Sequence, residues 1–272
     1  MKYVNMQGTK VPSLGFGTWQ LTGASCVAST RKALEIGYRH IDTAQIYENE
    51  AEVGKALKES SVAREELFVT TKLWTSNFTA PRVQASAEES LKKLGLDYVD
   101  LLLIHWHNPD VPLKETLGAM QKLVEQGKVK QIGVSNFTVA LMKEAQQFAK
   151  IACNQVEYHV LLSQRAVLEQ ARKSDMMVTA YSPLARGKLT ENSALQQIAK
   201  KHGKTPGQVA LRWLVEQENV SAIPKAASEK NARSNFEIFD FVLDADDQKA
   251  IWSLNGNGRT INPGWAPEWD AA

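Results

Sequence analysis

The sequence predicts an α/β fold, a (β/α)8 TIM barrel with an N-terminal hairpin and a C-terminal extra helix and tail. Short apolar segments alternate with segments of helical period eight times along the chain. A helix between two strands returns the chain in the same direction, so these strands must be parallel. The alternative is an open doubly wound sheet. With a bound dinucleotide that sheet would carry a G-x-G-x-x-G turn, and none follows the first strand.

The elements can be taken in order along the chain. A hairpin is expected over residues 3–11, with its turn at Gln7-Gly8. Strands are expected at residues 14–17, 39–42, 68–73, 99–105, 131–135, 153–157, 177–181 and 221–224. Helices are expected at residues 26–35, 50–60, 80–94, 114–125, 139–149, 165–173, 193–202, 206–216, 229–238 and 245–255. The tail after them has no period, and its Trp265 and Trp269 must either plug a groove or line one.

Composition limits the class of protein. A chain of 272 residues with 43% hydrophobic residues can bury a large core, so residues 1–272 are expected to form one domain. The net charge of +2 is spread along the chain without runs of like charge, which argues against a nucleic-acid surface. No apolar stretch is long enough for a signal peptide or a membrane span, so a cytoplasmic protein is expected. Nothing marks an interface, so it is expected to be a monomer.

The two cysteines and three of the histidines are the residues that could bind a metal ion. Cys26 and Cys153 show no metal-ligand spacing and are expected to be buried as small hydrophobes, without a disulfide. His105, with His107 beside it and His159 further on, leaves a metal site as an alternative use of these histidines. The prediction is that no metal is bound.

The carboxyl ends of the expected strands carry the polar residues that matter most. In a barrel of parallel strands the active site lies at these ends. Asp42, Lys72 and His105 stand at the ends of the second, third and fourth strands, with Tyr47 in the loop that follows Asp42. Alone, Lys72 could reach outward and His105 could be an ordinary core residue. Together they form a buried charged cluster, which is costly unless it has a function.

Such a cluster suits proton donation to a carbonyl oxygen. A tyrosine hydroxyl is a weak acid with an ordinary pKa of about 10, and a nearby ammonium stabilises its phenolate. Lys72 is therefore expected to lower the pKa of Tyr47, which acts as the general acid. Asp42 would hold Lys72, and His105 would donate a hydrogen bond to the substrate oxygen.

Three motifs resemble the aldo-keto reductase family. They run from Gly37 through Asp42, Tyr47 and Asn49-Glu50 to Gly54, then over Thr71-Lys72-Leu73-Trp74, and then over Ile104-His105-Trp106. The closing Ala266-Pro267-Glu268-Trp269-Asp270 looks most like the bacterial 2,5-diketo-D-gluconate reductases. The resemblance implies reduction of aldehydes and ketones to alcohols by hydride transfer from NAD(P)H, with Asp42, Tyr47, Lys72 and His105 as the catalytic residues.

The resemblance also implies where cofactor and substrate bind. Ser135, Asn136 and Gln155 correspond to residues that hold the nicotinamide carboxamide, and Tyr181 to the ring that stacks on it. The cofactor channel and its adenosine phosphate end would be formed by Thr18, Trp19, Ser182, Leu184, Arg186, Ile223, Lys225, Ala226, Ala227, Ser228, Asn231 and Asn235. The substrate-binding residues would be Trp19, Tyr47, Trp74, His105, Trp106 and Trp265.

Three positions near the adenosine end depart from the family pattern. Ala226 replaces a serine, Asn231 an arginine and Ser234 a glutamate. Asparagine cannot grip a phosphate with the planar fork of arginine. A strict preference for NADPH is therefore not expected. Lys225 and Ser228, helped by Arg233, are expected to favour NADPH while NADH is also accepted. Diketo sugar acids, methylglyoxal, keto steroids and keto mycotoxins all remain open as substrates. The alternative to an enzyme is a binding protein that senses the cofactor.

Overall fold

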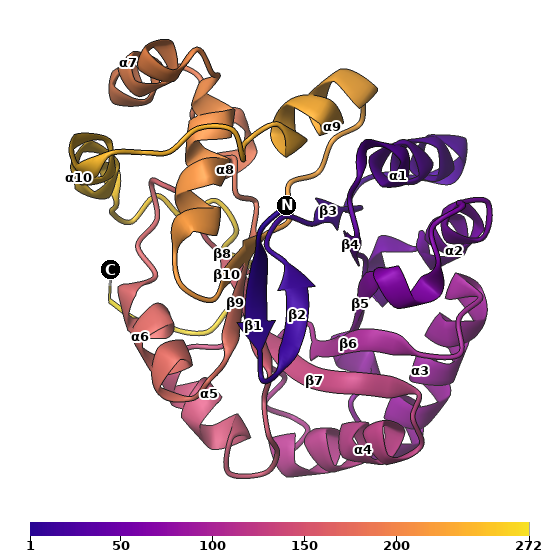
Figure 1. Ribbon diagram of the computed structural model, residues 1–272. Coiled ribbons are helices and arrows are strands. Elements are labelled where there is room, and N and C mark those ends of the chain that lie inside the picture. The colour runs from indigo at the N-terminus through magenta and orange to yellow at the C-terminus, as the bar shows by residue number, and fades with distance from the viewer. Residues whose placement is uncertain (272) are drawn as a thin grey trace.

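The computed structural model describes residues 1–271 and shows one sheet of parallel strands curled into a barrel (Figure 1). Neighbouring strands follow chain order: β3 (Phe16–Gly17), β4 (His40–Asp42), β5 (Phe68–Leu73), β6 (Val99–Ile104), β7 (Val129–Ser135), β8 (Cys153–Glu157), β9 (Met177–Tyr181) and β10 (Val220–Ala222). Parallel bridges from Leu14 to Ala222 and from Gly17 to Lys225 join the first strand to the last. The predicted barrel is thus confirmed, and the open sheet was the wrong alternative.

A hairpin of β1 (Tyr3–Met6) and β2 (Thr9–Pro12) lies in front of the barrel in the view of Figure 1. Met6 and Val11 are fully buried, and they pack in one apolar cluster with Phe68, Leu101 and Met177 from the strands. Phe68 and Met177 are the first residues of β5 and β9, so the hairpin covers the end where strands begin. The carboxyl ends of the strands therefore remain open for a binding site.

Helices surround the sheet on its outside (Figure 1). They are α1 (Gly23–Ile36), α2 (Glu50–Lys58), α3 (Ala80–Leu94), α4 (Leu113–Glu125), α5 (Val139–Ala145), α6 (Arg165–Lys173), α7 (Ser193–His202), α8 (Pro206–Glu216), α9 (Glu229–Phe236) and α10 (Ala245–Leu254). Gly54 lets α2 pack closely against the end of α3, because a Cβ there would lie 2.5 Å from the carbonyl oxygen of Leu94. The extra C-terminal helix is confirmed as α10.

Element boundaries differ from the prediction by a few residues. The predicted helix at residues 139–149 ends at Ala145, because Gln147 and Phe148 donate to carbonyls only three residues back, which tightens the turn. The first barrel strand has only two paired residues, although Leu14 still bridges to Ala222. Short 3-10 helices that the periodicity did not indicate occur at η1 (Gln45–Tyr47), η2 (Arg64–Glu66), η3 (Thr75–Asn77) and η4 (Ala185–Gly187).

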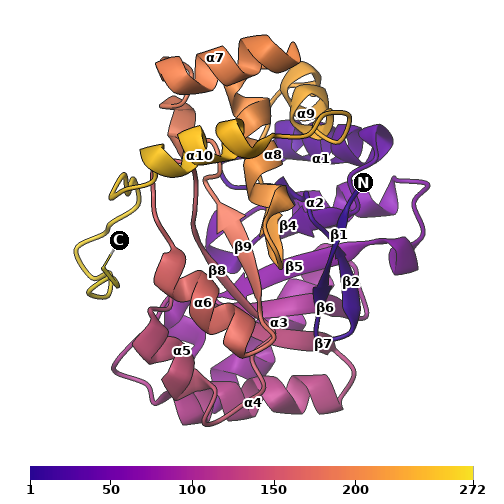
Figure 2. The same ribbon diagram turned by 60° about the vertical axis from the view of Figure 1, so that its left-hand side comes forward.

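The tail after α10 runs along the side of the molecule opposite the hairpin in the view of Figure 2. Its first part is tied to the loop after β8 by a bridge between Asn257 and Leu162 and by a hydrogen bond from Gly258 N to Leu161 O of 2.8 Å. Both cysteines are buried and free, as predicted. Within residues 1–271, no helix combines the length and the apolar character needed to cross a membrane.

Candidate active site

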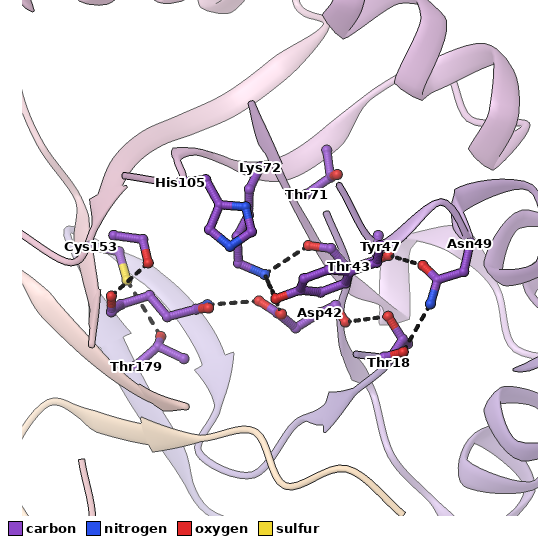
Figure 3. Close-up of polar contacts among 12 residues, drawn as sticks. Thr18, Asp42, Thr43, Tyr47, Asn49, Thr71, Lys72, His105, Cys153 and Thr179 are labelled. Carbon is purple, nitrogen blue, oxygen red and sulfur yellow. Dashed lines mark hydrogen bonds and ion pairs between the residues drawn. The ribbon is translucent and has the colours of Figure 1, made fainter. Parts of the chain in front are cut away.

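Asp42, Tyr47, Lys72 and His105 come together at the carboxyl ends of β4, β5 and β6 (Figure 3). The Lys72 ammonium donates to Asp42 Oδ1 at 2.5 Å, to the carbonyl oxygen of Thr43 at 2.8 Å and to the Tyr47 hydroxyl at 3.4 Å. The side chain of Lys72 has no exposure to solvent and that of Asp42 has 2%. Strand pairing thus brings together residues that are distant in sequence, of which Asp42 and His105 are 63 positions apart.

Burial governs the electrostatics of this cluster. It holds the pKa of Tyr47 well above its ordinary value, and the carboxylate of Asp42 acts in the same direction. It also lowers the pKa of Lys72, against the opposing effect of Asp42. The pKa of Tyr47 is therefore raised in the protein alone, and not lowered as predicted, because desolvation is the largest influence on it. The phenol stays protonated, which is the form a proton donor requires.

His105 stands beside the Tyr47 ring, with the ring centroids 5.7 Å apart and nearly perpendicular. Burial, followed by the charge of Lys72, lowers the pKa of His105 well below its ordinary value. The imidazole is therefore neutral near pH 7 and carries one N–H, so it can donate one hydrogen bond into the site. Trp74 also packs against His105 in a T-shaped arrangement, with ring centroids 5.4 Å apart.

Hydrogen bonds hold the loop that carries Tyr47. Asn49 is fully buried, accepts from the Thr43 hydroxyl at 2.7 Å and donates to the carbonyl oxygens of Thr18 and Leu21 at 2.9 Å each (Figure 3). Gln45, on η1 with Tyr47, accepts from Trp74 N and donates to the carbonyl oxygen of Ser86. Sequence reasoning did not single out Gln45, because nothing local to it marks partners 29 and 41 residues away.

A cavity of about 520 Å³ opens above the cluster. Its lining includes many of the residues predicted as catalytic, substrate-binding or cofactor-binding: Trp19, Asp42, Tyr47, Trp74, His105, Trp106, Asn136, Gln155, Tyr181, Ser182, Arg186, Ile223, Lys225 and Trp265. It also includes residues that sequence reasoning missed: Gly17, Ile46, Pro183, Thr260, Ile261, Asn262 and Pro263. The tail residues among them carry no periodic signal that could have placed them.

Amide groups line one wall of this cavity. Gln155 donates to Asp42 Oδ2 at 2.7 Å, and Asn136 accepts from the Tyr181 hydroxyl at 2.7 Å and donates to the carbonyl oxygen of His105 at 3.0 Å. Ser135 is 1% exposed and donates to the carbonyl oxygen of Gln155, so the structure places it behind this wall. Side-chain amides offer both donors and acceptors, which fits a carboxamide ligand.

A second cavity of about 400 Å³ continues the first. The two share Trp19, Ser182, Pro183, Arg186 and Lys225, and the second adds Gln20, Leu184, Gly187 and Pro224. Arg186 lies over the Trp19 ring, with its guanidinium carbon 5.1 Å from the centroid. Together the cavities form a long groove with cations along one part, and such a shape suits an extended, negatively charged ligand.

The remaining predicted cofactor residues lie outside both cavities. Thr18 is fully buried and donates to the carbonyl oxygen of Asp42 at 2.9 Å. Ala227, Ser228 and Asn231 are exposed at the start of α9, where the Ser228 hydroxyl accepts from Asn231 N at 3.2 Å. Ala226 and Asn235 are buried, with 3% and 8% exposure.

The histidines do not gather at one point. The structure brings no three His, Cys, Asp or Glu side chains together for a metal ion within residues 1–271. His107 packs edge-on against Phe137, with centroids 5.9 Å apart, and His159 is hydrogen-bonded to Glu157. Each of these two rings therefore has a local partner away from His105.

The chain is similar to proteins of known family. A family model described as the Aldo/keto reductase family matches residues 13–255. Methylglyoxal reductase DkgB of Escherichia coli O157:H7 is 43% identical over 266 residues, which is 96% of this chain and 99% of that protein. Glyoxal reductase of Bacillus subtilis (strain 168) is 42% identical over 255 residues, 93% of this chain and 92% of that protein.

Solved structures agree with this. A crystal structure that carries the provisional name 2,5-diketo-D-gluconic acid reductase B matches with a TM-score of 0.97 and 47% identity, covering 100% of this chain and 98% of that one. MGS-M4, an aldo-keto reductase from a Medee basin deep-sea metagenome library, matches with a TM-score of 0.92 and 41% identity over 98% and 99% of the two chains. The resemblance drawn from three motifs is confirmed: the chain belongs to the aldo/keto reductase family and is an oxidoreductase that acts on carbonyl compounds.

Proposed function

We propose that residues 1–272 work as one barrel domain that reduces aldehydes and ketones to alcohols, with Tyr47 as the proton donor. The observation that carries the proposal is the placement of a protonated phenol 3.4 Å from a buried ammonium, at the floor of a cavity large enough for a substrate. The family uses NAD(P)H, and when bound this cofactor supplies the hydride that reduces the carbonyl carbon.

Each member of the cluster has a role that follows from its contacts. Tyr47 transfers its proton to the carbonyl oxygen as negative charge develops there. Lys72 then stabilises the phenolate, because an ammonium held nearby in a water-poor site interacts strongly with a new anion. Asp42 fixes the position of Lys72 through the 2.5 Å bond. The neutral His105 donates a hydrogen bond to the same carbonyl oxygen and orients it beside Tyr47.

The groove supports a nicotinamide dinucleotide in an extended conformation. Asn136 and Gln155 offer amide groups for the carboxamide, and the Tyr181 ring lies in the same wall for stacking on the nicotinamide. Arg186 provides positive charge along the part shared by both cavities, where the pyrophosphate would lie. This division of roles is supported by donor chemistry and by the residues that the two cavities share.

NADPH is proposed as the preferred cofactor, with NADH also usable. Lys225 and Ser228 are exposed at the adenosine end and can meet a 2′-phosphate. Arg233 is less available, because it pairs with Glu229 at 2.9 Å, and Asn231 stands where the family has arginine. The ratio of kcat/KM for NADPH to that for NADH tests this proposal: a modest ratio supports it, and a ratio of several thousand would refute it.

The substrate class is proposed from the cavity and from the relatives. Methylglyoxal, glyoxal and diketo-gluconate reductases are similar to this chain, so small dicarbonyls and diketo sugar acids are candidates. The cavity wall formed by Trp74, Trp106 and Trp265 also offers apolar surface to larger bodies such as a keto steroid or keto mycotoxin. A panel of kcat/KM values across these classes ranks them.

Tyr47→Phe tests the reaction itself. Loss of the hydroxyl removes one 3.4 Å hydrogen bond, so folding and cofactor affinity should change little. Turnover should fall by at least about 100-fold, since general acids contribute roughly 10²–10⁴ to rate. Binding of the cofactor, followed by fluorescence titration, is the control. A variant that kept a tenth of wild-type turnover would show that Tyr47 is not the acid.

A further inference from the structure

Glu157, the last residue of β8, holds a segment that is distant in sequence. Its side chain has no exposure, and its carboxylate accepts from Thr260 N at 2.8 and 3.1 Å, from the Thr260 hydroxyl at 2.5 Å and from Ile261 N at 2.9 Å. His159 Nε2 adds a fourth donor at 3.0 Å. The carboxylate cannot donate, so the proton of this last bond belongs to the imidazole.

The charge of Glu157 depends on these donors. Burial by itself would raise the pKa of Glu157, but the hydrogen bonds from His159, Thr260 and Ile261 outweigh burial and lower it. A buried carboxylate satisfied in this way forms charge-assisted hydrogen bonds, which are about twice as strong as neutral ones. Glu157 is thus an anion whose main partners are the backbone and side chain of the tail.

The segment that Glu157 holds forms part of the active-site cavity. We call residues 259–270 the strap. Thr260 and Ile261 line the cavity directly, and further along the strap Trp265 lines it as well. The Trp265 ring packs edge-on against Trp106 and Trp74, with centroids 4.8 and 6.2 Å apart. One wall of the substrate site therefore consists of chain with no regular secondary structure.

Contacts at its two ends and packing between tryptophan rings also fix the strap. Upstream, Gly258 passes so close to Leu161 that a Cβ would lie 2.5 Å from its carbonyl oxygen. Downstream, Asp270 accepts from Val139 N at 2.9 Å, at the start of α5. Between these ends Trp265 is 55% exposed and packs on Trp74 and Trp106, and Trp269 packs on Trp106 with ring centroids 6.1 Å apart. Glu157 is the buried polar anchor between the two ends.

We propose that Glu157 is a positioning residue that fixes the strap and thereby sets the preference for carbonyl substrates large enough to reach Trp265. The inference rests on the proposed function, since Trp265 matters only for a substrate whose carbonyl lies at Tyr47 and His105. A three-carbon dicarbonyl is small enough to be held by those two residues. A fused-ring ketone extends to the tryptophans and needs the strap in place.

Limited trypsin digestion tests the anchor without any assay of turnover. Cleavage after Arg259 requires the strap to leave Glu157, whereas Lys188, exposed next to η4, serves as the reference site. In Glu157→Gln the ratio of cleavage after Arg259 to cleavage after Lys188 should rise by roughly tenfold or more, because several charge-assisted bonds are lost. An unchanged cleavage ratio would show that Glu157 does not anchor the strap.

Two variants of Thr260 test the same anchor if Glu157→Gln does not fold. Thr260→Val removes the hydroxyl bond and keeps the shape, and should raise the cleavage ratio by roughly three- to tenfold. Thr260→Ser keeps the hydroxyl, and its ratio should stay near that of the wild type. Equal ratios in the valine and serine variants would overturn the proposal.

Kinetics then test specificity. We expect the kcat/KM for acetonaphthone, a fused-ring ketone, divided by that for methylglyoxal to fall by roughly tenfold in Glu157→Gln, mainly through a higher KM for the ketone. A ratio equal to that of the wild type would overturn the specificity role. Failure of the proposed function would look different: the wild type would turn over no carbonyl, while the cleavage ratios would still report on the anchor.

Discussion

Protonation of His40 should destabilise the barrel at mildly acidic pH. The ring is 1% exposed, lies edge-on to Phe68 with centroids 5.0 Å apart, and has only a long contact of 3.3 Å from Nδ1 to the carbonyl oxygen of Pro12. Burial lowers the pKa of His40 from 6.5 to about 4. Asp42 favours the charged ring and Lys72 disfavours it, and neither overcomes the burial.

The magnitude follows from the two pKa values. Between pH 6.5 and 4 the unfolded chain binds a proton that the folded protein excludes, so stability is complete above this window and declines as the pH falls through it. The whole difference corresponds to about 3 kcal/mol, of which about 2 kcal/mol is lost by pH 5. This is a large part of the stability of an ordinary domain, which is about 5–15 kcal/mol.

Urea unfolding of the wild type and of His40→Asn at pH 7.5 and pH 5 measures the effect. The variant is less stable at both pH values because the ring is gone, but its loss between them should be smaller by about 2 kcal/mol. The lowered pKa values of His105 and His107 act in both proteins and cancel in the comparison. Equal losses for the two proteins would show that His40 is not the titrating group.

Two further predictions concern the catalytic cluster and the cofactor rim. Lys72→Met leaves the Asp42 carboxylate without its ammonium and should lower the free energy of unfolding by about 3–5 kcal/mol. The double variant Asp42→Asn/Lys72→Met should recover more than half of that loss in urea unfolding, and no recovery would contradict the ion-pair account. Asn231→Arg should raise the NADPH to NADH ratio of kcat/KM by roughly 10- to 100-fold, since a charge-assisted bond to the 2′-phosphate contributes about 1.5–3 kcal/mol. Asn231→Gln is its uncharged control, and an equal ratio in both variants would refute a role for this position.

Much of the fold and of the site could be predicted from local spacing. Six residues of β5 and five each of β8 and β9 coincide with the predicted runs, because a buried parallel strand is a short apolar run between helical periods. Asp42 and Lys72 were predicted to pair because both end adjacent strands, and they do so at 2.5 Å. A barrel brings strand ends together, so position along the strand was sufficient information.

The pKa of Tyr47 could not be obtained in the same way. Spacing placed an ammonium near the phenol but did not show how completely both are removed from water, and desolvation proved to be the larger effect. The hydrogen-bond partners of Gln45 could not be predicted from the sequence either. Its hydrogen bonds reach Asn77 in η3 and Ser86 in α3, which adjoin it only after the barrel has closed.

The sequence by itself therefore determined the barrel, the reaction class and the convergence of Asp42, Tyr47, Lys72 and His105. Only the tertiary structure decided which further residues line the cavity above them. The strap has no hydrophobic period, and its course depends on Glu157 accepting from residues 103 and 104 positions away and on tryptophan rings packing across the cavity. Contacts between an irregular segment and a distant strand leave no periodic pattern in the sequence, because their geometry exists only once the barrel has formed.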